Sequence, residues 1–142
     1  MILSTRIVKR SKPIILLLLL LPSILWGITF AQGNLGINPI DKLMDELGKM
    51  ALRLIIVTLI ISSLSQFKFF RSFQNIRRMI GLTAFYYVLC HFLTYIVLDH
   101  FFNWKFIIKD IVKRPFITFG FINFVLFLPL VLTSANARLK KI

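Results

Sequence analysis

The sequence is dominated by long apolar runs that contain no charged side chain. The clearest are residues 14–30, which include six consecutive leucines, and residues 79–98. A helix needs about 20 mostly apolar residues to cross the hydrocarbon core of a bilayer. The runs therefore predict membrane-spanning helices, and at that length the chain has room for about four of them.

Composition excludes most other classes of protein. Hydrophobic residues make up 58% of the chain and charged residues only 16%, whereas soluble domains carry about a quarter charged residues. A soluble core of this size would leave much of that apolar surface in water, and a disordered chain would need low hydrophobicity. The net charge of +13 on so apolar a chain favours a lipid surface, and not nucleic acid, as the anionic partner.

We expect an all-α, polytopic membrane protein whose helices form one bundle domain over residues 1–142. The predicted spans are residues 14–30, 48–67, 79–98 and 116–135. The polar stretch after the first span starts with turn residues and continues as an amphipathic, interfacial helix that leads into the second span. Residues 99–115 mix aromatic and charged side chains, as segments lying in the membrane interface do.

The basic residues predict the orientation of the chain. With four spans, the N-terminal segment, the 68–78 connection and the C-terminal tail share one side and carry 11 of the 18 Lys and Arg residues. Short loops rich in Lys and Arg stay in the cytoplasm, so both termini are expected inside. A signal peptide cleaved after Ala31 would have a similar N-terminal pattern, but the length of the apolar run and the interfacial Trp26 favour an uncleaved span.

His91 is the residue most indicative of chemistry. It lies in the third apolar run, 12 positions after Met79, or about 18 Å along a helix and just past the bilayer midplane. An ionisable residue inside a span is a candidate functional site, and a neutral imidazole is a common axial ligand of haem iron. A structural hydrogen bond between packed helices is the commoner role for such a residue, so both interpretations stay open on the residues alone.

The other candidate residues lie near the predicted membrane faces. Arg53, Arg77 and Arg78 are candidates for binding an anionic group of a cofactor, although topology and lipid head groups explain them equally well. His100 is expected to be solvated at the outer boundary, and Cys90 to be a small buried residue. The sequence has no glycine-rich phosphate loop, no catalytic triad and no pair of carboxylates within one span, so neither substrate chemistry nor proton pumping is expected.

A longer motif surrounds His91. The segment from Arg77 to Tyr95 has the pattern RR-x-x-GL-x-x-F followed by LH-x-x-x-Y, with Cys90 in place of the leucine before the histidine. Supporting pieces follow the same order along nearly the whole chain: Gly36 to Pro39, Arg53 to Ile61, Lys113-Arg114-Pro115, Gly120 and Leu132-Thr133-Ser134. In these features the chain resembles the MsrQ (YedZ) family.

That resemblance implies a specific role. Members of the family are haem-binding subunits of the bacterial inner membrane, similar to the ferric-reductase-like transmembrane group. The implied cofactor is haem b, with His91 as an axial ligand, and FMN has also been associated with the family. Electrons would come from a cytoplasmic flavin reductase or from quinone. They would pass to a periplasmic, molybdenum-dependent methionine-sulfoxide reductase that repairs oxidised proteins.

The chain departs from the family pattern at its C-terminal end. Family members continue through a Gly-Lys-Arg-Trp segment to further histidines that complete haem ligation, and the sequence stops at Ile142 before them. We therefore expect an incomplete member, or one that needs a second copy or another chain. The alternative is a small cationic membrane protein with a structural or assembly role, or a non-functional fragment, without a cofactor.

Overall fold

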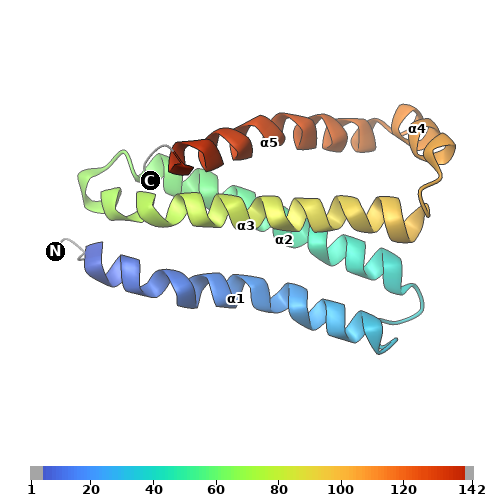
Figure 1. Ribbon diagram of the computed structural model, residues 1–142, viewed down its shortest axis with the longest axis horizontal. Helices are drawn as coiled ribbons and strands as arrows, with labels where there is room; N and C mark the ends of the chain where they lie inside the picture. Colours follow the sequence, from blue (N-terminus) through green and yellow to red (C-terminus); the bar gives the residue numbers. More distant parts are fainter. Residues whose placement is uncertain (1–4, 140–142) are drawn as a thin grey trace. The chain divides into compact units, whose positions relative to one another are not determined.

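The computed structural model describes residues 5–139, and every regular element in that range is a helix (Figure 1). The elements in chain order are α1 (Thr5–Ala31), α2 (Pro39–Leu64), η1 (Lys68–Phe73), α3 (Gln74–Leu93), η2 (Thr94–Asp99), α4 (Trp104–Lys113) and α5 (Pro115–Leu139). Four helical stretches are long and apolar enough to cross a membrane: residues 6–31, 39–64, 76–99 and 115–133. The expected all-α fold with four membrane-spanning helices is confirmed.

The second of these helices differs from its predicted outline. The structure has no separate interfacial helix before the second span, because α2 runs without interruption from Pro39. Proline is well suited to the first turn of a helix, where its missing N–H is not needed, and Asp41 suits the positive end of the helix dipole. Helical hydrogen bonding does not require apolar side chains, so α2 begins before the apolar run does. Its first turns therefore carry charged side chains.

The chain divides into two compact units, residues 1–91 and residues 92–142. In the first unit, α1 contacts α2 and η1, and α2 contacts η1. The buried side chains of α2 recur at helical spacing and face the interior as a single stripe: Leu43, Leu47, Ala51 and Leu54. The buried residues of α3 in this unit follow the same spacing: Ile76, Ile80, Thr83, Ala84 and Tyr87.

Tyr87 ties α1 to α3. It is the one fully buried large side chain among the described residues, and its hydroxyl donates a hydrogen bond to the carbonyl oxygen of Leu19 in α1. The ring of Trp26 lies edge-on to it, with the ring centroids 6.4 Å apart. In an α-helix the Leu19 carbonyl also accepts the N–H of Ser23, so the Tyr87 hydroxyl is a second donor to this oxygen. The hydrogen bond and the ring contact therefore join α1 to α3 at one place.

The second unit begins with the last turn of α3 and continues into η2, which has π-helical geometry. The chain then turns at Phe101 and Phe102, whose φ angles are 48° and 60°, before α4 and α5 follow in contact with each other. Phe92 stacks on Phe124 with the ring centroids 4.6 Å apart.

Large apolar side chains cover much of the surface. None of the residues in the apolar windows of α1 and α5 is buried, and Leu17, Leu59 and Leu126 are each about 60% exposed. Surfaces of this kind suit lipid and not water.

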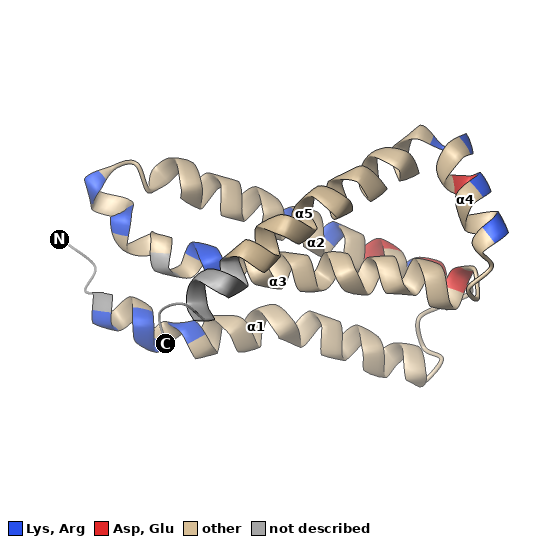
Figure 2. Cartoon of the chain, turned by 45° about the horizontal axis from the view of Figure 1, so that its top comes forward, with Lys and Arg blue, Asp and Glu red and all other residues tan. Residues whose placement is uncertain are grey.

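Lysine and arginine residues gather at the first turns of α1 and around η1 (Figure 2). Because α1 contacts η1, these two basic segments lie together in the first unit, as the predicted orientation requires of the N-terminal and 68–78 clusters. The basic C-terminal tail used in the same prediction lies mostly outside the described residues.

Candidate functional site

The side chain of His91 is held by the backbone of α2. Its Nδ1 lies 2.7 Å from the carbonyl oxygen of Met44. A carbonyl oxygen only accepts hydrogen bonds, so Nδ1 carries the proton, and in the neutral ring the lone pair is then on Nε2. Among the described residues, Nε2 has no hydrogen-bond partner. The ring therefore presents a free lone pair, as a metal-binding imidazole does.

A glycine allows this close approach. A Cβ atom added to Gly48 would lie 3.1 Å from both Nδ1 and Cε1 of His91. A glycine in the interior of a helix lowers the stability of the helix by about 0.5–1 kcal/mol relative to alanine. The imidazole thus occupies the space above α2 that a side chain at this position would fill.

The position of His91 along α2 is more polar than the sequence suggests. The same turns of α2 carry surface ion pairs: Lys49 to Asp45 at 2.6 Å and Lys42 to Glu46 at 3.5 Å. These turns hold three of the chain's five acidic residues. The histidine therefore packs beside the charged end of its partner helix and not beside its apolar half.

The three arginines singled out from the sequence are exposed. Arg53 lies five residues beyond Gly48 in α2, about 7.5 Å along the helix axis from the turn that contacts His91. Arg77 and Arg78 lie in the first turns of α3, about 20 Å along that helix from His91. Their role as partners of an anionic group stays a prediction.

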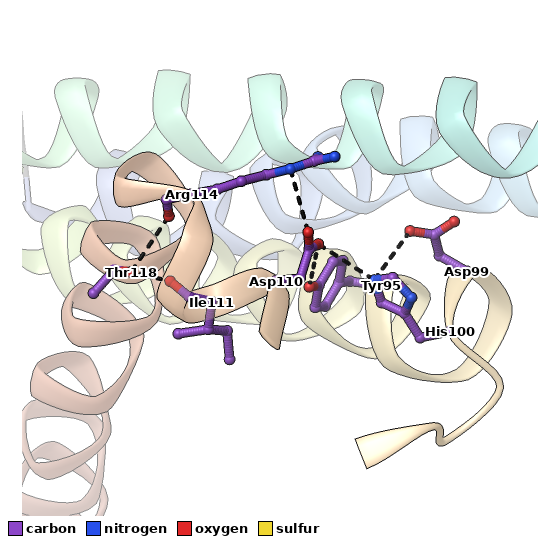
Figure 3. Close-up of polar contacts among 7 residues, drawn as sticks. All are labelled: Tyr95, Asp99, His100, Asp110, Ile111, Arg114 and Thr118. Atoms are coloured by element: carbon purple, nitrogen blue, oxygen red, sulfur yellow. Dashed lines mark hydrogen bonds and ion pairs between the residues drawn. The ribbon is translucent and has the colours of Figure 1, made fainter. Parts of the chain in front are cut away.

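A second polar cluster lies in the unit of residues 92–142 (Figure 3). Asp110 of α4 is its centre: the hydroxyl of Tyr95 donates to Oδ2 at 2.9 Å, and Nε of Arg114 lies 3.2 Å from Oδ1. Nε2 of His100 lies 3.6 Å from a carboxylate oxygen of Asp110 and 3.6 Å from one of Asp99. These contacts hold α4 against η2.

The expectation for His100 was wrong. Its side chain is only 20% exposed, and its Nε2 is buried, so water does not solvate it as expected for a boundary residue. The cause is the turn at Phe101 and Phe102, which folds α4 back so that Asp110 covers the histidine. No local pattern in the sequence indicates this contact, since His100 precedes the turn and Asp110 lies 10 residues later, in α4.

The described residues do not form a metal site built from protein side chains alone. Within residues 5–139, no three His, Cys, Asp or Glu side chains lie close enough to hold an ion. Cys90 is half-buried, and the residue three before it is Tyr87, so the paired cysteines that attach haem covalently are missing.

Comparisons with known proteins identify the family of the chain. Residues 47–141 match the family described as the ferric reductase like transmembrane component. The protein-methionine-sulfoxide reductase heme-binding subunit MsrQ of Caulobacter vibrioides is 48% identical over 104 residues, which are 73% of this chain and 50% of that protein. The same subunit of Brucella anthropi is 46% identical over 79% of this chain and 50% of its own length.

A third relative aligns over almost the whole chain. The MsrQ subunit of Azospira oryzae is 40% identical over 98% of this chain and 60% of its own length. The chain thus spans about half the length of the first curated relatives that it matches. No solved structure matches it significantly. The family match covers more than half of the sequence, so the chain belongs to the ferric reductase like transmembrane family and is similar to its MsrQ heme-binding subunits.

Proposed function

We propose that this protein is a haem b-binding electron-transfer subunit of the membrane and that Nε2 of His91 is an axial ligand of the iron. The hydrogen bond from Nδ1 of His91 to the Met44 carbonyl carries the proposal, because it leaves the lone pair on Nε2. Relatives with 40–48% identity are named heme-binding subunits. The absence of a second cysteine in the chain favours b-type binding without covalent attachment.

The haem would supply one-electron oxidation and reduction. His91 would contribute the ligand nitrogen, and the Met44 carbonyl would fix the ring orientation and tautomer by accepting a hydrogen bond from Nδ1–H. The ion pairs in the same turns of α2 are exposed, so their charges would act on the site only after screening by solvent. The chain itself would perform no chemistry on a substrate.

The wider system is part of the same proposal, and the similarity to MsrQ heme-binding subunits supports it. We place the protein in the bacterial inner membrane with a cytoplasmic N-terminus. Electrons would enter from a cytoplasmic flavin reductase or from quinone and leave to a periplasmic, molybdenum-dependent methionine-sulfoxide reductase. If FMN also binds, Arg77 and Arg78 are the candidates for its phosphate, because arginine recognises phosphate in a bidentate manner.

An absorption spectrum tests the proposed function. The full chain, expressed with a haem supply and purified in detergent, should show a Soret band that shifts on reduction. His91→Ala should lose this band while circular dichroism stays helical, and His100→Ala should keep it, because His100 belongs to the cluster around Asp110. Normal haem content in His91→Ala would reject the ligand assignment. A colourless but folded wild-type protein would favour the alternative, a structural or assembly protein without a cofactor.

A further inference from the structure

We propose that Gly48 is a positioning residue that sets the protonation and orientation of the His91 imidazole. Two distances in the structure support it. The His91 Nδ1 lies 2.7 Å from the Met44 carbonyl oxygen, and the same nitrogen would lie 3.1 Å from a Cβ at position 48. The ring therefore takes both its hydrogen bond and its space from one turn of α2.

Helix geometry explains why the two contacts belong together. In an α-helix the carbonyl of residue 44 accepts the N–H of residue 48, and a carbonyl oxygen has a second lone pair. Each Cα–Cβ bond tilts toward the N-terminus of its helix, so a side chain covers the turn before its own Cα. A side chain at position 48 would thus cover the Met44 carbonyl, and glycine leaves its second lone pair open to His91.

The other helical glycines do not have such a contact. A Cβ at Gly81 would meet Cγ2 of Thr58 at 3.7 Å, an ordinary contact, and a Cβ at Gly27 would meet nothing within 4 Å. The same Gly→Ala change at these two positions therefore adds one methyl group to a helix of the same unit without touching His91. Both substitutions are matched controls for Gly48→Ala.

Gly48→Ala should displace the imidazole by a few tenths of an ångström and weaken its bond to Met44. In the haem-free protein, more of the neutral ring should then carry its proton on Nε2, where it blocks metal ligation. This part stands on the His91 geometry alone. The consequence for bound haem rests on the proposed function: a less basic imidazole stabilises ferric iron less well, so the reduction potential should rise.

The haem-free experiment uses the full chain in detergent with ¹⁵N-labelled histidine. A His100→Asn background leaves His91 as the single histidine, and the ¹⁵N shifts of the ring report which nitrogen is protonated. We expect the Nδ1-protonated form to dominate. Gly48→Ala should lower its ratio to the Nε2-protonated form by about 2- to 10-fold, the worth of one hydrogen bond. Gly27→Ala and Gly81→Ala should leave the ratio unchanged.

The second measurement is a redox titration of the haem-loaded protein. Gly48→Ala should have a higher reduction potential than the wild type and both control variants. The proposal is overturned if wild-type His91 is protonated mainly on Nε2, or if Gly48→Ala has the same tautomer ratio as Gly27→Ala. Should Gly48→Ala not fold, a wild type protonated mainly on Nε2 would still overturn the proposal. A wild type that loads no haem would reject the proposed function, while the haem-free ratio would still test the role of Gly48.

Discussion

Nδ1 of His91 in α3 and the carbonyl oxygen of Met44 in α2 form a hydrogen bond of 2.7 Å between two helices that are long and apolar enough to cross a membrane. The contact joins residues 47 positions apart, and it orients the one histidine that the family motif singles out. Because a backbone carbonyl supplies the acceptor, no side-chain substitution at Met44 removes it. A substitution at Gly48 is therefore a way to alter this hydrogen bond while keeping both of its partners.

The hydroxyl of Tyr87 should stabilise the attachment of α1. Tyr87→Phe keeps the buried ring but removes its hydrogen bond to the Leu19 carbonyl, which should lower the free energy of unfolding by about 1 kcal/mol. Thermal unfolding in detergent measures the effect. Tyr86→Phe is the control, because the Tyr86 hydroxyl makes a long, exposed contact of 3.4 Å with Ser23 and otherwise contacts the thiol of Cys90, a weak hydrogen-bonding group. Equal midpoints for the two variants would contradict the prediction.

The carboxylate of Asp110 should hold α4 against η2. Asp110→Asn removes the charge that Tyr95, His100 and Arg114 share, at a cost of about 2 kcal/mol for hydrogen bonds to a partly buried charge. Amide hydrogen exchange in α4 should accelerate, by roughly 30-fold if exchange follows local opening.

Asp99 provides the control for this change. Its carboxylate contacts His100 at 3.6 Å and lies in the same cluster, so Asp99→Asn should accelerate exchange in α4 much less. If the two asparagine variants have the same exchange rates, Asp110 is not the centre of the cluster.

The arginine pair should be dispensable for haem. Arg77 and Arg78 lie about 20 Å from His91 along α3, so Arg77→Gln with Arg78→Gln should leave the Soret absorbance per protein unchanged. Any FMN that copurifies with the wild type should decrease, because the pair is the proposed phosphate contact. A flavin content that does not change would reject that contact, and a lost Soret band would place the arginines closer to the haem than proposed.

The orientation of the chain can be tested with reporter fusions. A periplasm-specific reporter fused after Asn103 should be active, because the 99–115 segment is predicted outside. The same reporter fused after Phe70, inside the basic connection, should be inactive. Activity in the opposite pattern would overturn the predicted orientation.

Much of the architecture could be predicted because it depends on local properties of the sequence. Whether a segment such as residues 79–98 enters lipid depends on the summed free energy of transferring its own side chains from water to lipid. Contacts with distant residues do not enter that sum. The same holds for the all-α fold, since a helix satisfies its backbone polar groups within one segment. Family membership was predictable for a related reason, because the motif around His91 is contiguous in the chain.

The contacts at the two polar sites could not be predicted in this way. The sequence by itself determined that His91 would lie in a membrane span and that His100 would follow it near a boundary. Only the tertiary structure decided that His91 would meet Met44 and Gly48, and that Asp110 would cover His100. Such pairings depend on the rotation of each helix about its axis and on the turns between helices. These are set by the packing of many side chains at once and leave no periodic signal in either segment.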